Sequence, residues 1–277
     1  MSVYYKERGE FLRQSINSML TQTTLPEQFV LVCDGELTPE LNAVVAFYEN
    51  EHPKLFSIVR LPTNQGLARA LDVGLEHCHN EIVARMDSDD ISLPIRCELQ
   101  LKLMTQYNAD ILSGAIMEFE TIPKDSTTIR KPPENHDKII RFAKQRNPFN
   151  HPCVMFRKSA VLKVGGYHLQ NANHNFPLLE DYCLWARMLM NGSRTHNAPE
   201  VLLYMRTGSG LYRRRGGLSY FLNMMRFKKY IRKIGLSTWL DFIGCIPAHL
   251  VSCFALDSLR RLIYSKFLRE RKERVEF

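Results

Sequence analysis

The stretch Glu81-Ile82-Val83-Ala84-Arg85-Met86-Asp87-Ser88-Asp89-Asp90 indicates the fold of this chain more directly than any other segment. Residues 81–86 form a short, mostly apolar run that is typical of a buried strand, and three carboxylates follow it within four residues. Carboxylates this close repel one another, and a fold tolerates them most easily where a cation or backbone donors offset their charge. We therefore expect a strand whose end presents Asp87, Asp89 and Asp90 to a divalent metal. The alternative is a solvated turn that precedes a helix.

On both sides of this stretch the sequence alternates strand-like and helix-like segments. Buried strands are predicted over residues 28–33, 55–59, 81–86 and 110–113, and helices over 11–21, 39–51, 66–78 and 94–107. Thr38 before Pro39 is a typical helix start. This βαβα order predicts an α/β fold with a mixed, mainly parallel sheet and helices on both faces.

Sheets of this kind bind ligands beyond the carboxyl ends of their strands. Asp34-Gly35 follows another predicted strand, where Asp34 can accept a hydrogen bond from a nucleobase or a ribose, although Asp-Gly is also an ordinary turn. Asn64-Gln65-Gly66 begins a predicted helix whose free N–H groups, together with Arg69, can face a phosphate. This segment lacks the glycine spacing of a dinucleotide fingerprint or a P-loop.

From His136 the pattern changes to α+β, with a strand predicted over 152–156 and a helix from Glu180 to Met190. Glu180-Asp181 at the start of that helix either interact with its dipole or supply a general base. His151 is a candidate substrate contact or a turn histidine, and Arg213-Arg214-Arg215 is a candidate anion clamp or a solvated loop.

Charge is divided unevenly along the 277 residues, whose formal net charge is +8. Residues 206–277 hold 16 Lys and Arg against 5 Asp and Glu, whereas residues 1–205 hold 21 against 24. A mildly acidic body with a basic tail favours a catalytic domain held at an anionic surface over a nucleic-acid-binding protein. A hydrophobic fraction of 45% excludes disorder, and seven scattered cysteines without a C-x-x-C pair predict neither a disulfide framework nor a zinc ribbon.

The tail combines apolar and basic residues in a pattern typical of membrane-surface helices. Residues 236–256 are weakly charged, but Asp241, Pro247 and His249 interrupt them, so we expect no membrane span. Apolar side chains between Trp239 and Phe254 precede a basic cluster at 260–274, which predicts an interfacial amphipathic helix pair. The alternative is a helix packed on the body with a basic solvent face. The first residues contain no apolar signal core, so we do not expect secretion by that route, and the scattered cysteines favour a reducing, cytoplasmic location.

Taken together, these segments resemble the family 2 glycosyltransferases, in particular the bacterial enzymes that build exopolysaccharide, capsule and O-antigen. The similarity covers residues 1–235 in order, through Met1-Ser2-Val3-Tyr4, Gln22-Thr23, Asp34-Gly35, Asn64-Gln65-Gly66-Leu67, Ala84 to Asp90, Asn150-His151-Pro152, Gly165-Gly166-Tyr167 and Glu180 to Trp185.

The resemblance implies a GT-A catalytic domain over 1–205, a helical C-terminal region over 206–277, a nucleotide-sugar donor, and Mn²⁺ or Mg²⁺ as cofactor. The residues it assigns to the donor are Ser2, Val3, Tyr4 and Glu7 at the nucleoside, Asp34 at the uracil, and Asn64, Arg69, Asp87 and Ser88. Asp89 would be the main metal ligand, with Asp87 and Asp90 beside it. Asp181 would be the catalytic base with Glu180 as its neighbour. His151, Arg206, Arg213, Arg214 and Arg215 would contact the acceptor or the diphosphate.

The implied reaction transfers one sugar, with inversion, from a UDP-sugar such as UDP-galactose or UDP-glucose to a lipid-diphosphate-linked saccharide. The Q-x-x-R-W signature of processive synthases is absent from the sequence, which favours a single addition. The expected location is the inner face of the bacterial cytoplasmic membrane, as a peripheral protein without a nucleic-acid partner.

Two other classes of protein remain as alternatives. A sugar nucleotidyltransferase would share the sheet and the carboxylates, but we would expect a Gly-rich loop where this chain has Tyr4-Tyr5-Lys6-Glu7. A non-enzymatic protein that binds anionic surfaces would explain the basic tail, but not the acidic strand end.

Overall fold

The computed structural model describes residues 1–123, 126, 128–169, 176–208, 216–255 and 270–271. Its first half contains β1 (Ser2–Val3), α1 (Gly9–Leu20), β2 (Phe29–Cys33), α2 (Pro39–Glu51), β3 (Phe56–Arg60), α3 (Leu67–Glu76), β4 (Ile82–Ala84), β5 (Ile91–Ser92), α4 (Arg96–Gln106) and β6 (Ile111–Phe119). The second half contains β7 (Thr128–Arg130), α5 (His136–Ala143), the 3₁₀ turn η2 (His151–Cys153), β8 (Met155–Arg157), α6 (Lys158–Lys163), α7 (Glu180–Met190), β9 (Thr195–Arg206), α8 (Gly217–Lys233), α9 (Trp239–Phe254) and β10 (Glu270–Arg271).

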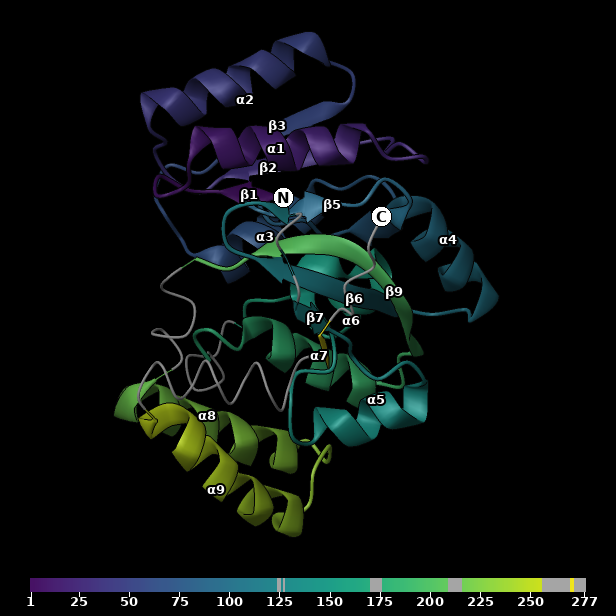
Figure 1. Ribbon diagram of the computed structural model, residues 1–277, viewed down its shortest axis with the longest axis vertical. Helices are drawn as coiled ribbons and strands as arrows, with labels where there is room; N and C mark the ends of the chain where they lie inside the picture. Colours follow the sequence, from purple (N-terminus) through teal and green to yellow (C-terminus); the bar gives the residue numbers. More distant parts are fainter. Residues whose placement is uncertain (124–125, 127, 170–175, 209–215, 256–269, 272–277) are drawn as a thin grey trace.

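A parallel sheet of β1, β2 and β3 carries helices on both faces, as the sequence predicts. Every residue of β2 is buried. Phe29 and Leu31 belong to the core formed with α1 and α2, whereas Val30 and Val32 pack with Ala70 of α3. In Figure 1 α2 accordingly lies above these strands and α3 lies below them. Thr38 accepts a hydrogen bond from the Leu41 N–H at 3.3 Å, which confirms the predicted start of α2.

The second sheet follows the order β10-β7-β6-β8-β4, and β9 pairs with β6 in parallel and with β5 in antiparallel orientation. Strand β8 lies between β4 and β6 and is antiparallel to both. The expected mixed sheet is therefore confirmed, but antiparallel pairs are more frequent than the βαβα order indicates. The reason is that β8 arrives from a distant part of the chain and separates two strands that the alternation alone would pair.

The core of the second half is centred on α7, which spans the predicted residues. Trp185 is fully buried, and its ring lies 5.7 Å from that of Phe149 and 6.1 Å from that of Tyr167. Phe227 and Ile231 of α8 belong to the same core. The hydrophobic core of the second half therefore includes the first C-terminal helix, α8.

Lys228 connects α8 to this core through a fully buried ammonium group. Its Nζ donates to the carbonyl oxygens of Lys144 at 3.0 Å and Gln145 at 2.7 Å, and it lies 3.1 Å from the hydroxyl of Tyr182. Burial lowers the pKa of Lys228 to about 8. Among the described helices, none is long and apolar enough to cross a bilayer.

Candidate active site

Three carboxylates converge in the turn between β4 and β5. Asp87, Asp89 and Asp90 each place a carboxylate oxygen within 4.8 Å of the others. Arg96, which is fully buried, supports this turn by donating a hydrogen bond to the carbonyl oxygen of Arg85 at 2.6 Å. We refer to residues 85–90 as the acidic turn.

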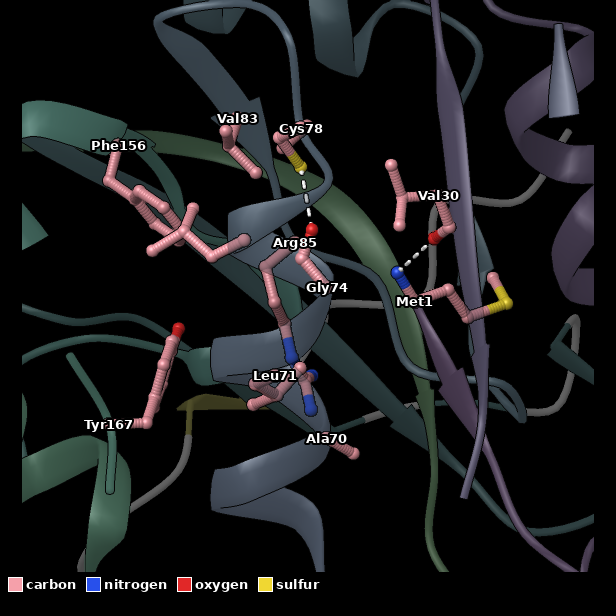
Figure 2. Close-up of a pocket in the computed structure, with 12 residues that line it drawn as sticks. Met1, Val30, Ala70, Leu71, Gly74, Cys78, Val83, Arg85, Phe156 and Tyr167 are labelled. Atoms are coloured by element: carbon pink, nitrogen blue, oxygen red, sulfur yellow. Dashed lines mark hydrogen bonds between the residues drawn. The ribbon is translucent and has the colours of Figure 1, made fainter. Parts of the chain in front are cut away.

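Arg85 places a cation in contact with one of these carboxylates, that of Asp87. Its Nη2 contacts Oδ1 of Asp87, whereas its Nε and Nη1 have no hydrogen-bond partner within the described residues. Figure 2 shows the Arg85 side chain in a pocket that Leu71, Val83 and Tyr167 also line. Burial by itself lowers the pKa of Arg85, but the charge and hydrogen bond of Asp87 more than offset this, and the pKa is raised. The guanidinium therefore stays charged, although the exposed fraction of Arg85 is only 5%.

A single arginine does not neutralise three carboxylates. Asp90 is 2% exposed; its Oδ1 accepts the backbone N–H of Arg206 at 2.8 Å, and its Oδ2 has no partner in the described part of the chain. Burial, followed by the charges of Asp89 and Asp87, raises the pKa of Asp90 well above its usual range. Burial, with the charges of Asp87 and Glu7, raises the pKa of Asp89 to about 7. An unpartnered buried oxygen and excess negative charge fit a divalent cation, and carboxylate oxygens suit Mg²⁺ or Mn²⁺.

Arg206, at the end of β9, lies against the same turn. Its guanidinium carbon is 3.8 Å from the ring centroid of Phe11 and 4.6 Å from that of Phe119. Its Nε donates to the carbonyl oxygen of Asp89 at 3.0 Å, and its Nη2 to Gln14 at 2.7 Å. The two rings and Gln14 hold this cation at the acidic turn.

The N-terminal segment also reaches the acidic turn. The Ser88 hydroxyl donates to Oε2 of Glu7 at 3.0 Å, and the Ser15 hydroxyl donates to the carbonyl oxygen of Asp87 at 2.6 Å. Ser2 and Val3 form β1, with Val3 buried, whereas Tyr4 is 38% exposed. The structure therefore brings together Glu7 and Ser88, two of the residues predicted to contact the donor.

Asp34 follows β2 and is buried. Its Oδ1 accepts the Gln65 N–H at 2.7 Å and its Oδ2 accepts the Gly66 N–H at 3.0 Å, so it holds the loop before α3. Gly35 has a φ of +85°, and a Cβ there would lie 2.6 Å from the backbone nitrogen of Asn64. Gly35 thus allows the tight turn, and the Asp34 carboxylate holds the loop that precedes α3.

Two other candidate donor residues, Asn64 and Arg69, have described contacts with residues outside the acidic turn. The Asn64 side chain donates to the carbonyl oxygen of Asp34 at 3.2 Å in an exposed loop. Arg69 lies 3.7 Å from Glu76 on the surface of α3, and no described contact connects it to the carboxylates. Arg213, Arg214 and Arg215 lie outside the described residues.

A second carboxylate site forms at the start of α7. Oδ2 of Asp181 accepts a hydrogen bond from Nδ2 of Asn147 at 2.6 Å, and its Oδ1 accepts the N–H of Tyr182 at 2.8 Å. Nδ1 of His151 lies 4.0 Å from Oδ2 of Asp181. Burial, with the charge of Arg85, lowers the pKa of His151 well below its usual range, so this ring is neutral. Burial and the adjacent Asp181 raise the pKa of Glu180.

The loop that faces this second site is held by Asp72 of α3. Asp72 accepts the N–H groups of Tyr167 at 2.6 Å and His168 at 2.7 Å. Gly166 has a φ of +72°, and a Cβ there would lie 2.5 Å from Asp72 Oδ1, so only glycine allows this approach. The Tyr167 hydroxyl lies 3.3 Å from Nε2 of His151.

No site role is predicted from the sequence for Arg85, Asp72, Asn147 or Tyr167. Arg85 directly precedes the acidic residues, and a buried cation beside three carboxylates is the signal that could have identified it. Asn147 and Asp72 carry no local signal, because their partners lie 34 and 95 residues away.

Comparison with known proteins identifies the family. The model of the family described as "Glycosyl transferase family 2" matches residues 2–165, more than half of the chain. The chain belongs to the family 2 glycosyltransferases. It is 35% identical, over 97% of its own length and 95% of the relative's, to UDP-Gal:alpha-D-GlcNAc-diphosphoundecaprenol beta-1,3-galactosyltransferase of Escherichia coli. It is 38% identical to the amylovoran biosynthesis glycosyltransferase AmsE of Erwinia amylovora, over 85% of this chain and 86% of AmsE.

A solved structure supports the fold of this glycosyltransferase. The mannosyltransferase PcManGT from Pyrobaculum calidifontis, in complex with GDP-Man and Mn²⁺, superposes with a TM-score of 0.58 at 18% identity, over 91% of this chain and 73% of that one. The expected GT-A fold with additional C-terminal helices is thereby confirmed. Membership of the family also sets aside a nucleotidyltransferase and a non-enzymatic binding protein.

Proposed function

We propose that this glycosyltransferase transfers one hexose, with inversion, from a UDP-sugar to a lipid-diphosphate-linked saccharide in bacterial surface polysaccharide synthesis. UDP-galactose and UDP-glucose are the donors proposed first. The E. coli relative supports this choice, because its name gives UDP-Gal as donor and a GlcNAc-diphosphoundecaprenol as acceptor. AmsE supports the polysaccharide context.

The acidic turn is the proposed metal and diphosphate site. Asp89, with Asp87 and Asp90, would hold Mn²⁺ or Mg²⁺, which when bound supplies positive charge that stabilises the leaving nucleoside diphosphate. The unpartnered Oδ2 of buried Asp90 is the observation that best supports this assignment. Arg206 adds a protein cation beside the same turn, and Arg213 to Arg215 are proposed to act there as well.

The nucleoside is proposed to bind between β1 and the acidic turn. Ser2, Val3 and Tyr4 would line this pocket, and Glu7 would orient Ser88 through the hydrogen bond between them. Asp34 is proposed to meet the uracil, in addition to holding the Gln65 and Gly66 N–H groups. Asn64 and Arg69 remain proposed donor contacts.

Asp181 is the proposed general base, which takes the proton from the attacking acceptor hydroxyl. The observation that carries this role is the hydrogen bond from Asn147, since a residue from another segment fixes Oδ2 in place. Glu180 is proposed to orient donor or acceptor from the same helix end. Neutral His151 lies close enough to contact the acceptor beside Asp181.

We further propose residues 1–205 as the catalytic domain and the inner face of the bacterial cytoplasmic membrane as the place of action, with the enzyme as a peripheral protein. A diphosphoundecaprenol acceptor, as in the name of the E. coli relative, is a membrane lipid and supports this location.

The test is transfer to a synthetic GlcNAc-diphospholipid, with UDP-galactose and UDP-glucose supplied separately in the presence of Mn²⁺. We expect addition of a single hexose in a β-linkage, measured by mass spectrometry and NMR, and loss of the product when EDTA is added. An α-linked product would contradict inversion. Transfer of several sugars in series would contradict single addition.

A further inference from the structure

The solvent face of α9 is apolar over its whole length. The exposed residues of this helix are Trp239, Leu240, Ile243, Gly244, Pro247, Ala248, Leu250, Val251 and Phe254. Leu240 is 83% exposed, and Ile243, Val251 and Phe254 are each more than half exposed. The spacing of these four residues places them on one side of the helix. Single exposed apolar residues are ordinary on protein surfaces, but a continuous apolar face marks an interaction site.

The polar residues of α9 lie away from this face. Asp241 is half-buried, accepts the backbone N–H of Thr238 at 2.8 Å, and lies 3.6 Å from Lys144 of the body. Phe242 and Cys245 are buried on the inner side of the helix. The exposed apolar face is therefore an additional surface, distinct from the side by which α9 packs on the protein.

A basic row on α8 flanks the apolar face. Arg226, Lys229 and Lys233 are exposed at spacings of three and four residues, and Leu218 and Leu222 continue the same row toward the N-terminus of α8. Figure 1 shows α8 and α9 side by side, at the end of the molecule opposite α2. Arg232 lies 3.9 Å from the ring centroid of Trp239, which places a further cation at the edge of the apolar face.

We propose that α8 and α9 form the surface by which this enzyme docks on an anionic bilayer, with α9 lying in the interface and the basic row at the lipid headgroups. The charge of this surface selects the occupant, because α8 and α9 together carry five Lys and Arg, four of them outside the core, against one Asp. A second copy of the chain would bring the same positive charge to the contact. At 16 residues α9 is about 24 Å long, shorter than a hydrocarbon core of about 30 Å, so it lies along the surface.

This inference rests on the proposed function for its purpose, since a lipid-linked acceptor places the enzyme at a membrane. The test is independent of transfer: full-length protein is sedimented with vesicles of phosphatidylglycerol and phosphatidylethanolamine, without donor or acceptor. We expect binding to these vesicles and none to pure phosphatidylcholine. A loss of transfer with intact vesicle binding would contradict the proposed function alone.

The decisive variant replaces Leu240, Ile243 and Val251 by Gln. These side chains are exposed, so we expect the melting temperature to stay the same and vesicle binding to fall at least tenfold. The matched control replaces Leu25, Phe47 and Leu162 by Gln, which are exposed apolar residues elsewhere, and it should bind as the wild type does. Equal sedimentation of the wild type and the α9 variant would overturn the proposal. A wild type that ignores vesicles but forms a dimer that the α9 variant loses would overturn it in favour of self-association.

A second variant, with Arg226, Lys229 and Lys233 replaced by Gln, tests the basic row. A basic residue at an anionic surface changes partitioning about fivefold, so three together should weaken binding by about 10². The remaining binding should respond less to added NaCl than that of the wild type. An unchanged salt response would overturn the role of α8 in docking.

Discussion

The two carboxylate sites of this enzyme are built in opposite ways. In the acidic turn, three carboxylates crowd together beside two arginines, Arg85 and Arg206, and burial raises the pKa values of Asp89 and Asp90. At the start of α7, Asp181 is held by the neutral amide of Asn147 and by a backbone N–H, beside a neutral histidine. Among the described residues, the first arrangement has more negative than positive charge, which suits the proposed metal site, whereas the second holds one carboxylate in place by hydrogen bonds, which suits the proposed general base.

The largest effect is expected from Asp89→Ala, which removes the proposed main metal ligand. Transfer should fall below detection and Mn²⁺ binding, measured by calorimetry, should be lost. The melting temperature should stay the same or rise by a few degrees, because a repulsion between carboxylates is relieved. Glu51→Ala, an exposed carboxylate on α2, is the control and should behave as the wild type. Full activity of Asp89→Ala in the presence of EDTA would refute the metal assignment.

Asp181→Asn tests the proposed general base at the start of α7. The amide keeps the shape of the side chain but cannot accept the proton, so kcat should fall by about 10² or more. Binding of UDP and Mn²⁺ should be unchanged, since the acidic turn is intact. Glu180→Gln serves as the neighbouring control and should reduce kcat less. Near-normal turnover of Asp181→Asn would move the role of base to Glu180 or His151.

Arg85 contacts a carboxylate of the acidic turn directly, through its Nη2 and Oδ1 of Asp87. Arg85→Met should raise the Mn²⁺ concentration needed for half-maximal activity by about 10- to 100-fold, the range typical of residues that orient metal ligands. Arg85→Lys should restore part of this affinity, since it keeps the charge beside Asp87. If Arg85→Met leaves the Mn²⁺ dependence unchanged, Arg85 is a structural residue alone.

The pH dependence is the smallest expected effect. The pKa of Asp89 is about 7 in the folded protein, against 3.8 as its ordinary value. The folded state therefore binds more protons than the unfolded state between these values, and metal-free protein should lose stability as pH rises from about 4 to 7. Mn²⁺ affinity should increase over the upper part of this range, because the metal binds the ionised form.

Thermal melting of metal-free Asp89→Asn measures this effect, since an amide does not titrate. Its melting temperature should depend less on pH than that of the wild type, and should exceed it by about 2 °C or more at pH 8. Parallel pH profiles of the two proteins would show that Asp89 is already ionised well below pH 7.

The sequence predicts those parts of the molecule whose cause is local. The apolar run of β2, the cap at Thr38 and the bounds of α7 follow from adjacent residues, and the structure confirms them. The insertion of β8 between β4 and β6 has no local cause. The hydrophobic periodicity of a strand does not indicate which distant strand it pairs with.

The same division applies to the site. The acidic turn can be predicted from the sequence, because its carboxylates are nearly consecutive and the repulsion among them indicates a cation site. The support of Asp181 by Asn147, and of the Tyr167 loop by Asp72, depends on contacts across 34 and 95 residues. Nothing in either segment indicates its partner, so these positioning residues emerge only from the fold.

The buried ammonium of Lys228 has a consequence for modularity. It belongs to a helix of the proposed docking surface, yet its partners are two backbone carbonyls after α5 and the hydroxyl of Tyr182, the residue next to the proposed base. The C-terminal helices therefore cannot be exchanged between related enzymes independently of the rest of the protein. A chimera that places α8 and α9 of this chain on a relative carries Lys228 into a body where it must find the same three oxygens. We expect only relatives with matching geometry after α5 to be compatible, so membrane attachment and catalytic scaffold would evolve together.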